Sequence, residues 1–317
     1  MKKILVLKGG ISPEREISLV SGAEIAKELR LSQYDVCELD PADYPRLADL
    51  LLAIEAEHPF MVFNGLHGGC GENGDLQAAL QLAGIPFTGS LSKGSTLAMD
   101  KYIAKLLVAE EGVPVPKHIL MRGNLLEDYN DPMDYRAITE TLGLPIIVKP
   151  NDAGSSVGIS MVEDIASLKE AVNEAFKYCS TVLLEEYIPG RELTVSILDD
   201  KAMPVVEIKP KAGWYDYQNK YTKGNTEYLA PAPIDEAMAH LAQLYAVRAF
   251  KALSCSVYGR VDFRLDEDKL YFLEVNTLPG MTALSLTPMA AKAAGMSFGD
   301  LLETIIKNSV ARHVEVS

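Results

Sequence analysis

Two short segments near the end of the chain carry acidic and amide side chains at a spacing of two residues. They are Arg260-Val261-Asp262-Phe263 and Glu274-Val275-Asn276. Because residues two apart on a β-strand share a face, each segment presents its two polar side chains on one side. If the segments pair as a hairpin, the polar faces meet, and two carboxylates with an amide oxygen suit Mg²⁺ better than zinc or copper. An exposed polar strand face without a metal is the alternative.

A second candidate site is the loop of small residues that follows Lys149-Pro150. It ends in Gly154-Ser155-Ser156-Val157-Gly158. Glycine and serine leave backbone N–H groups free to surround a phosphate, and a lysine at the end of the preceding strand adds a positive charge. The order differs from that of a Walker loop, GxxxxGK[ST]. The segment therefore indicates either another phosphate-binding arrangement or an ordinary glycine-rich turn.

A third segment matches a dinucleotide-binding fingerprint in its letters but not in its context. Gly69-Cys70-Gly71-Glu72-Asn73-Gly74 reads G-x-G-x-x-G and stands between an expected strand and an expected helix. It does not lie in the first strand–helix unit, however, and residues 91–98 contain no acid that would hold a ribose. A nicotinamide-dependent oxidoreductase is therefore the disfavoured alternative.

Two isolated charges have ordinary explanations when each is taken alone. Lys101 opens an expected helix, where a lone lysine is usually a solvated charge, and Glu14 is an acid of the kind favoured at a helix N-terminus. The stretch 209–231 is less ordinary, because it shows no helix or strand period and holds five aromatic residues and four lysines. Long structureless loops inside compact domains are usually functional, so we predict a closing lid there rather than a disordered linker.

The elements that would position these segments fall into three groups along the chain. Residues 1–95 alternate between strand and helix patterns, which predicts a parallel sheet covered by helices. Residues 96–180 and 181–317 mix strands and helices without that alternation, so we predict an α/β protein of three lobes. The expected strands are 4–7, 35–39, 60–63, 86–88, 118–121, 145–149, 157–162, 181–187, 192–198, 257–265 and 269–276, and the expected helices are 14–29, 44–55, 74–82, 100–111, 167–178 and 298–310.

Composition narrows the class of protein. The 317 residues are 48% apolar and 23% charged, with a formal net charge of −14. This charge disfavours nucleic acid as a partner, because the field of the protein repels phosphate. No segment reaches the roughly 18 consecutive apolar residues that a membrane span needs, so we expect no membrane partner. The four cysteines, Cys37, Cys70, Cys179 and Cys255, lie far apart, which is typical of free thiols in the reducing cytoplasm.

The order of the motifs, rather than any one of them, indicates a family. The chain resembles the ATP-grasp superfamily and, within it, the D-alanine–D-alanine ligase family over about residues 3–303. Asn73 departs from the aspartate that is usual in the family, and Leu284 from the histidine that is common there. The matching pieces are Gly9-Gly10, Glu14-Arg15-Glu16-Ile17-Ser18, His67-Gly68, Gly71-Glu72, Gly74, Asp100-Lys101, Lys149-Pro150, Gly154-Ser155-Ser156-Val157-Gly158, Asn219-Lys220-Tyr221, Gly259-Arg260, Asp262, Glu274, Asn276-Thr277, Pro279-Gly280-Met281-Thr282, Ser285-Leu286 and Pro288-Met289.

The resemblance implies a three-lobed ATP-grasp architecture, in which an N-terminal α/β lobe joins two α+β lobes that clamp ATP. It also implies a role for each of the matching site residues. ATP would be held by Lys101, Lys149, Ser156, Glu185, Ile188, Glu192 and Lys220. Two Mg²⁺ ions, or Mn²⁺ in their place, would be bound by Asp262, Glu274 and Asn276. The first substrate would meet Glu14 and His67, and the carboxylate of the second would meet Ser285 and Leu286. Ser155 and Tyr221 would bond Glu14 across the closed site, and Arg260 and Gly280 would face the oxyanion.

The resemblance also implies an activity. The protein would join two D-alanine molecules into D-alanyl-D-alanine for peptidoglycan synthesis, through a D-alanyl phosphate, and release ADP and phosphate. D-lactate or D-serine as the second substrate is the alternative, and Tyr221 favours the dipeptide. A catalytically inactive regulator is disfavoured because all three candidate metal ligands are present. Family members are often homodimers, so we expect one.

Overall fold

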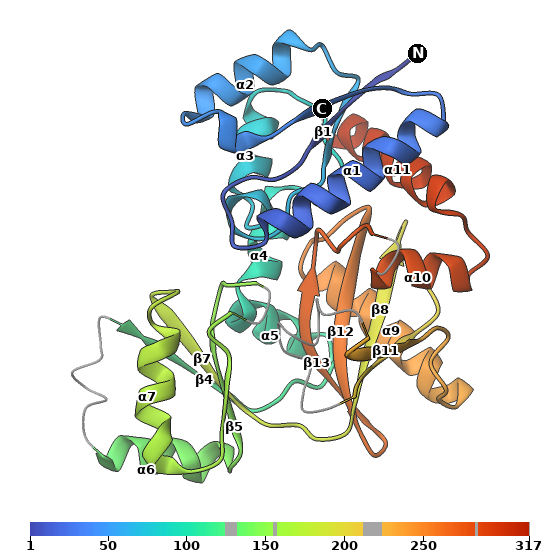
Figure 1. Cartoon of the computed structure of the whole chain (residues 1–317). Helices are drawn as coiled ribbons and strands as arrows, with labels where there is room; N and C mark the ends of the chain where they lie inside the picture. The colour runs from blue at the N-terminus through green and yellow to red at the C-terminus, as the bar shows by residue number, and fades with distance from the viewer. Residues whose placement is uncertain (124–131, 155–156, 212–223, 283–284, 317) are drawn as a thin grey trace.

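Three β-sheets, each with its own helices, divide the molecule into three parts (Figure 1). The structure is a computed structural model and describes residues 1–123, 132–154, 157–211, 224–282 and 285–316. In Figure 1 the part that contains the N-terminus lies above the largest sheet, and the part formed by the middle of the chain lies at the lower left. This is the three-lobed α/β architecture that the sequence predicts.

The N-terminal lobe is built on a parallel sheet in the order β2-β1-β3. Strand and helix alternate along this lobe, and parallel neighbours require such a crossover between them. The expected strand at 86–88 forms only a single parallel bridge, from Phe87 to Val62. The elements are β1 (Lys3–Leu7), α1 (Arg15–Leu31), β2 (Asp35–Leu39), η1 (Pro41–Asp43), α2 (Leu47–Ala56), β3 (Met61–Asn64), η2 (Gly69–Gly71) and α3 (Asp75–Leu82).

The central lobe holds an antiparallel sheet in the order β4-β7-β5-β6. Since β7 pairs with a strand on each side within this sheet, a lobe boundary after Glu186 keeps the sheet whole, whereas the expected boundary at 180 would separate β7 from it. The elements of this lobe are β4 (His118–Arg122), α6 (Pro132–Leu142), β5 (Ile146–Pro150), β6 (Ser160–Val162), α7 (Ile165–Ala175) and β7 (Thr181–Glu186). The two helices that precede it, α4 (Ser92–Met99) and α5 (Lys101–Glu110), pack against the C-terminal lobe instead.

The C-terminal lobe contains the largest sheet, in the order β11-β10-β8-β12-β13, with β9 beside β8. The expected hairpin is confirmed, because β12 and β13 pair antiparallel with Asp262 opposite Glu274 and Arg260 opposite Asn276. The elements are β8 (Arg191–Leu198), β9 (Lys201–Ala202), β10 (Val206–Pro210), β11 (Thr226–Leu229), α9 (Glu236–Ala252), β12 (Tyr258–Asp266), β13 (Lys269–Asn276), α10 (Leu286–Ala293) and α11 (Phe298–Val316).

Part of the stretch expected to lack regular structure belongs to this sheet. β10 and β11 pair antiparallel, so residues 209, 210 and 226–229 lie in strands. That part of the expectation for 209–231 was wrong, because cross-strand pairing can order a segment whose own sequence shows no period. Residues 212–223, where most of the expected lid would lie, are outside the described residues.

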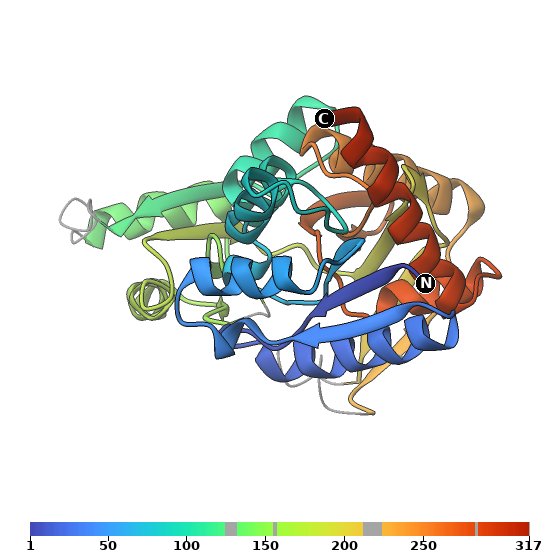
Figure 2. The same cartoon turned by 90° about the horizontal axis from the view of Figure 1, so that it is seen from above.

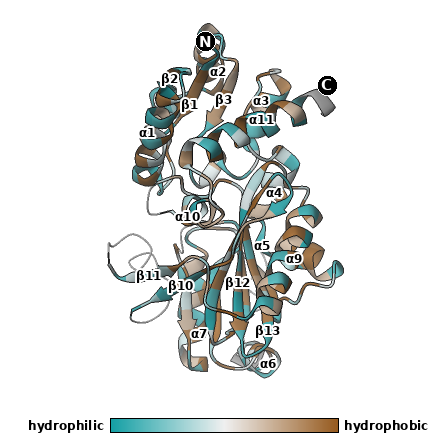
Figure 3. Ribbon diagram, turned by 90° about the vertical axis from the view of Figure 1, so that its right-hand side faces the viewer, coloured by the Kyte–Doolittle hydropathy of each residue, from teal (hydrophilic) through white to brown (hydrophobic). Residues whose placement is uncertain are grey.

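The last helix returns to the lobe in which the chain began. α11 packs against α1, and both chain ends lie at this lobe (Figures 1 and 2). Leu302 and Ile305 of α11 are fully buried in one cluster with Ile4 and Leu29, and each such burial stabilises the fold by about 1.5–3 kcal/mol. Brown, hydrophobic colouring dominates β1 and β3, whereas the helices show both colours (Figure 3). Among the described helices, none combines the length and apolar character needed to cross a bilayer.

Candidate active site

Two cavities open between the lobes and adjoin at one carboxylate. The larger has a volume of about 510 Å³ and the smaller about 120 Å³, and Glu274 lines both. The expected site residues divide between them. The larger cavity is lined by Glu14, His67, Lys101, Arg260, Glu274, Asn276, Gly280, Ser285 and Leu286. The smaller cavity is lined by Lys149, Glu185, Ile188, Glu192, Asp262 and Glu274.

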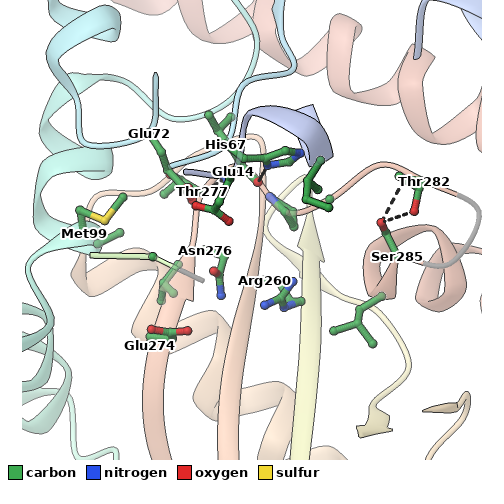
Figure 4. A pocket seen from close by; sticks show the side chains of 18 of the residues that line it. Glu14, His67, Glu72, Met99, Arg260, Glu274, Asn276, Thr277, Thr282 and Ser285 are labelled. Atoms are coloured by element: carbon green, nitrogen blue, oxygen red, sulfur yellow. Dashed lines mark hydrogen bonds between the residues drawn. The ribbon is translucent and has the colours of Figure 1, made fainter. Parts of the chain in front are cut away.

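The hairpin brings the three candidate metal ligands together. Asp262 lies opposite Glu274 in the strand ladder, and Asn276 Nδ2 donates a hydrogen bond to Asp262 Oδ2 at 3.0 Å. Figure 4 shows Glu274, Asn276 and Arg260 directed into the larger cavity from these two strands. The shared polar face that alternation along two strands predicts is therefore present.

Asp262 is fixed in place by hydrogen-bond donors. Arg260 donates from Nε to Oδ1 at 2.9 Å and from Nη2 to Oδ2 at 2.8 Å, and Thr194 Oγ1 donates to Oδ1 at 2.6 Å. The residue is only 5% exposed. Bidentate pairing with an arginine restricts both the rotamer and the plane of the carboxylate, so its orientation is set in advance of any ligand.

The donor set fits Mg²⁺ in its chemistry. It consists of two carboxylates and one amide oxygen, and hard oxygen ligands are those that Mg²⁺ prefers. Across the described residues, no group of three or more His, Cys, Asp or Glu side chains is arranged to hold a metal ion. A magnesium ion on this hairpin would therefore complete its coordination with phosphate oxygens and water, which is its usual mode of binding in phosphoryl-transfer sites.

Glu14 reaches the larger cavity from the N-cap position of α1. Two glycines make room for its carboxylate, because a Cβ on Gly68 would lie 2.3 Å from Glu14 Oε2 and a Cβ on Gly154 would lie 2.8 Å from it. Gly68 also has a φ of +62°, which side chains with a Cβ rarely adopt. The carboxylate thus lies between backbone segments of two lobes, where it can bind the cationic group of a ligand.

His67 fastens the loop after β13 to the N-terminal lobe. Its Nδ1 is 2.9 Å from the carbonyl oxygen of Leu278, and its Nε2 is 3.0 Å from Ser21 Oγ. Because a carbonyl can only accept, Nδ1 carries the hydrogen and Nε2 accepts from the serine hydroxyl. Burial lowers the pKa of His67, which agrees with a neutral ring. Both ring nitrogens therefore bond protein groups, and the expected contact of His67 with a substrate carboxylate stays a prediction.

Glu72 makes a second contact between the loop after β13 and the N-terminal lobe, although the sequence alone predicts no role for it. Its Oε2 accepts from the Gly68 N–H at 3.0 Å and its Oε1 from the Leu278 N–H at 3.2 Å. Burial, with the nearby charge of Glu14, raises the pKa of Glu72 to about 7. A cation bound beside Glu14 would favour the charged form of Glu72, so ligand binding and deprotonation are linked.

Lys101 is held at the larger cavity by the segment that follows Lys149. Its Nζ donates to the carbonyl oxygen of Ala153 at 2.7 Å and lies 3.5 Å from Glu274 Oε2. The N-cap of its helix, Asp100, accepts a hydrogen bond from Asn151 Nδ2 at 2.8 Å. The two segments that carry the candidate phosphate-binding lysines are therefore tied together.

Lys149 and Glu185 form the polar wall of the smaller cavity. Lys149 Nζ lies 2.6 Å from Glu185 Oε2, and both residues are almost fully buried. Burial alone would raise the pKa of Glu185, but two lysine ammonium groups outweigh it and hold the pKa below its usual value. Ile188 adds an apolar wall, and Glu192 lies 3.5 Å from Arg264 in an ion pair. An apolar slot with a few fixed polar groups suits a flat heteroaromatic ligand.

The far end of the larger cavity is the start of α10. Ser285 occupies the N-cap position, and within the described residues its side chain makes no capping hydrogen bond. Its Oγ instead accepts from the Thr282 N–H at 3.0 Å, and a Cβ on Gly280 would lie 2.7 Å from that oxygen. The first N–H groups of a helix, here beginning with Leu286, favour an anion. This end of the cavity therefore suits a carboxylate.

Four expected site residues lie outside the described residues. They are Ser155, Ser156, Lys220 and Tyr221, and their roles stay predictions.

Sequence reasoning missed Glu72 and Lys105. Glu72 stands between Gly71 and Gly74, in a segment that matches the family. Lys105 follows Lys101 by four residues, on the face of α5 that buries Ala104 and Val108. A lysine on an apolar helix face was the available signal.

Comparison with known proteins places the chain among ligases. A family profile described as the D-ala D-ala ligase C-terminus matches residues 107–307. The D-alanine–D-alanine ligase of Syntrophotalea carbinolica is 42% identical over 312 residues, which are 98% of this chain and 97% of that protein.

Solved structures agree with the sequence comparison. The crystal structure of D-alanine–D-alanine ligase from Bacillus anthracis has a TM-score of 0.87 at 34% identity, and the same enzyme complexed with ATP has 0.85 at 31%, with all of each chain covered. The VanG D-Ala:D-Ser ligase from Enterococcus faecalis has a TM-score of 0.82 at 31% identity and covers 97% of this chain and 99% of its own.

Proposed function

Because the chain belongs to the D-alanine–D-alanine ligase family, we propose that the larger cavity binds two D-alanine molecules and the smaller binds the base of ATP. The protein is an ATP-dependent ligase that joins D-alanine to D-alanine and forms ADP and phosphate, a step that supplies peptidoglycan synthesis. The observation that carries the assignment of the cavities is that Glu274 lines both. The γ-phosphoryl group of ATP would then move from the smaller cavity to the larger one beside Glu274.

The first half of the reaction makes a carboxylate reactive. A carboxylate is a poor electrophile because its leaving group would be oxide, so the γ-phosphoryl group of ATP is transferred to the first D-alanine to form an acyl phosphate and ADP. Lys101 and Lys149 neutralise the phosphates and hold them in line. Magnesium bound by Asp262, Glu274 and Asn276 would supply further neutralisation of the transferred group.

The second half of the reaction forms the peptide bond. Glu14 binds the ammonium group of the first D-alanine, and the start of α10, with Ser285 and Leu286, binds the carboxylate of the second. The amine of the second D-alanine, once it has lost a proton, attacks the acyl phosphate. Arg260 has five N–H donors and uses two of them on Asp262. The guanidinium group of Arg260, with the Gly280 N–H, stabilises the oxyanion, and phosphate leaves.

The test of this function is phosphate release from ATP with each candidate substrate, with the products identified by mass. We expect release with D-alanine alone and D-alanyl-D-alanine as the main product when D-alanine, D-serine and D-lactate compete. A main product that contains D-serine or D-lactate would change the second substrate, and no release with any of them would overturn the proposal. Titration with NADH, the cofactor of the disfavoured oxidoreductase, should give no binding signal.

A Gly68→Ala substitution should raise the KM for D-alanine by about tenfold or more. The added Cβ would lie 2.3 Å from Glu14 Oε2 and would displace the carboxylate that binds the substrate ammonium group. A loss of about 1.4 kcal/mol of binding free energy corresponds to a factor of ten in affinity. The matched control is Gly84→Ala. Gly84 has a similar φ of +68° but nothing within 4 Å of its Cβ position. Both variants carry the backbone strain, so equal KM values in the two would exclude a role for the contact with Glu14.

We further propose that the enzyme is a homodimer and works in the cytoplasm, where ATP is made. Support for the dimer comes from large apolar side chains exposed on the N-terminal lobe, which are Leu47 and Leu52 of α2 and Leu82 of α3. Exposed apolar groups mark a protein interface where they form one contiguous patch. Sedimentation at micromolar concentration would contradict the dimer if only a 34.6 kDa species appeared.

A further inference from the structure

Lys105 is a fully buried lysine that the reaction described above does not use. It lies on α5, one helical turn after Lys101, and its exposed fraction is 0%. Its Nζ is 2.9 Å from Glu185 Oε1 and donates to the carbonyl oxygens of Phe272 at 3.2 Å and Leu273 at 3.1 Å. A buried ammonium group is tolerated only when it is paired and hydrogen-bonded, so this position is highly specified.

One carboxylate serves two lysines at this point. Glu185 Oε1 faces Lys105, and Glu185 Oε2 lies 2.6 Å from Lys149 Nζ. The two lysines differ in access, because Lys149 lines the smaller cavity and Lys105 does not. Only Lys149 can therefore reach a bound nucleotide, while Lys105 stays behind the wall that Glu185 forms.

A nucleotide phosphate and Glu185 compete for the same ammonium group. When Lys149 turns to the phosphates, Glu185 loses one of its two positive partners. A buried carboxylate left without a partner would be strongly destabilised and would take up a proton. Lys105, which is also bonded to two carbonyl oxygens of β13, has no competing ligand and keeps Glu185 paired.

We propose that Lys105 is a positioning residue for nucleotide binding. Lys105 stays paired with Glu185 when ATP binds, so Lys149 can leave its ion pair with Glu185 and bind the phosphates of ATP. The proposal rests on the proposed function of the smaller cavity as the ATP site. The same ammonium group joins Glu185 of the central sheet to Phe272 and Leu273 of the C-terminal sheet.

The charges around the cluster support this division of roles. Burial lowers the pKa of Lys105 to about 8 and Glu185 opposes the shift, so the group remains mostly protonated at neutral pH. The charged groups that face Glu185 are Lys105 from α5 and Lys149 from β5, and Glu274 from β13 also acts on Lys105. Two ammonium groups against one carboxylate leave a net positive charge, which favours a polyphosphate ligand.

The test compares MgATP binding to the full-length protein and to Lys105→Met by calorimetry in two buffers of different ionisation enthalpy. We expect the variant to bind ATP about 10- to 100-fold more weakly, because among the described residues Lys149 is then the one cation left beside the buried Glu185 carboxylate. It should also take up about one more proton on binding than the unmodified protein, because Glu185 is left unpaired. The KM for D-alanine should stay within about twofold, since the larger cavity is not altered.

Three further variants separate positioning from packing. Lys105→Arg keeps the charge and should take up no extra proton. Lys105→Met combined with Glu185→Gln removes the unpaired carboxylate, so it should recover part of the ATP affinity that the single variant loses. Lys169→Met is the control, because Lys169 is an exposed lysine on α7, and it should behave as the unmodified protein.

The outcomes distinguish this inference from the proposed function. If the unmodified protein bound no ATP, the proposed function would fail. If it bound ATP but Lys105→Met had the same affinity and proton uptake, the role of Lys105 would be refuted while the function stood. A loss of affinity for ATP and D-alanine alike, with no recovery in the double variant, would identify Lys105 as a packing residue and would also overturn the inference.

Discussion

Glu274→Gln and Asp262→Asn should each lower the rate of ligation by about 100- to 1,000-fold, which corresponds to the several kcal/mol of charge stabilisation that a bound metal supplies. Both carboxylates lie on the shared face of the β12–β13 hairpin. Each substitution removes one negative ligand and leaves the side-chain shape nearly unchanged. The measurement is phosphate release at saturating ATP and D-alanine over a range of Mg²⁺ concentrations.

Of the two variants, Glu274→Gln is expected to change folding stability less, so its effect on the rate is easier to assign to the metal site. Asp262 is paired with Arg260 in a buried position, so its loss also costs folding stability, whereas the Glu274 side chain is 29% exposed and lies 3.5 Å from Lys101. Asp268→Asn, in the exposed turn of the same hairpin, is the matched control. Raising the Mg²⁺ concentration should partly restore Glu274→Gln, and normal rates at ordinary Mg²⁺ would remove the metal assignment.

Arg260→Met should reduce kcat by about 100- to 1,000-fold, the usual effect of removing one donor to a developing oxyanion. Two of its donors hold Asp262, so the substitution also frees a carboxylate of the proposed metal site. The KM for ATP should change much less than kcat, because we place the base of ATP in the smaller cavity, which Arg260 does not line. The measurement is steady-state kinetics with each substrate varied in turn.

Two further variants test whether the effect of Arg260→Met comes from the lost oxyanion donor. Arg260→Lys keeps the charge but loses the planar fork, so it should recover little of the rate. Arg248→Met removes an exposed arginine from α9 and should leave the kinetics unchanged. If the methionine variant kept its kcat, or if lysine restored it fully, the oxyanion role would have to be abandoned.

The features that could be predicted from the sequence are those that are local or periodic. The β12–β13 hairpin follows from alternation over two short segments, and the parallel N-terminal sheet follows from alternating strand and helix patterns. α9 was not predicted because its buried face is built largely from alanines, Ala242, Ala246 and Ala249, which contrast weakly with their neighbours. β10 and β11 depend on each other and on β8, so neither segment alone shows a clear pattern.

The missed site residues depend on contacts between distant parts of the chain. Glu72 acquires its role from Leu278, 206 residues away, and Lys105 acquires its role from Phe272, 167 residues away. No spacing rule reports that a turn in one lobe accepts hydrogen bonds from a loop in another. The placement of β7 in the central sheet is of the same kind, since only strand pairing reveals it.

The return of α11 to the N-terminal lobe has a consequence for synthesis on the ribosome. Leu302 and Ile305 complete the cluster that contains Ile4 and Leu29, so the first lobe to emerge is the last to acquire its full core. Until the final helix leaves the exit tunnel, the nascent lobe exposes apolar surface that would otherwise be covered. Chains that end before α11 would lack this covering, so we expect them to be cleaved by proteases more readily than the chain that includes it.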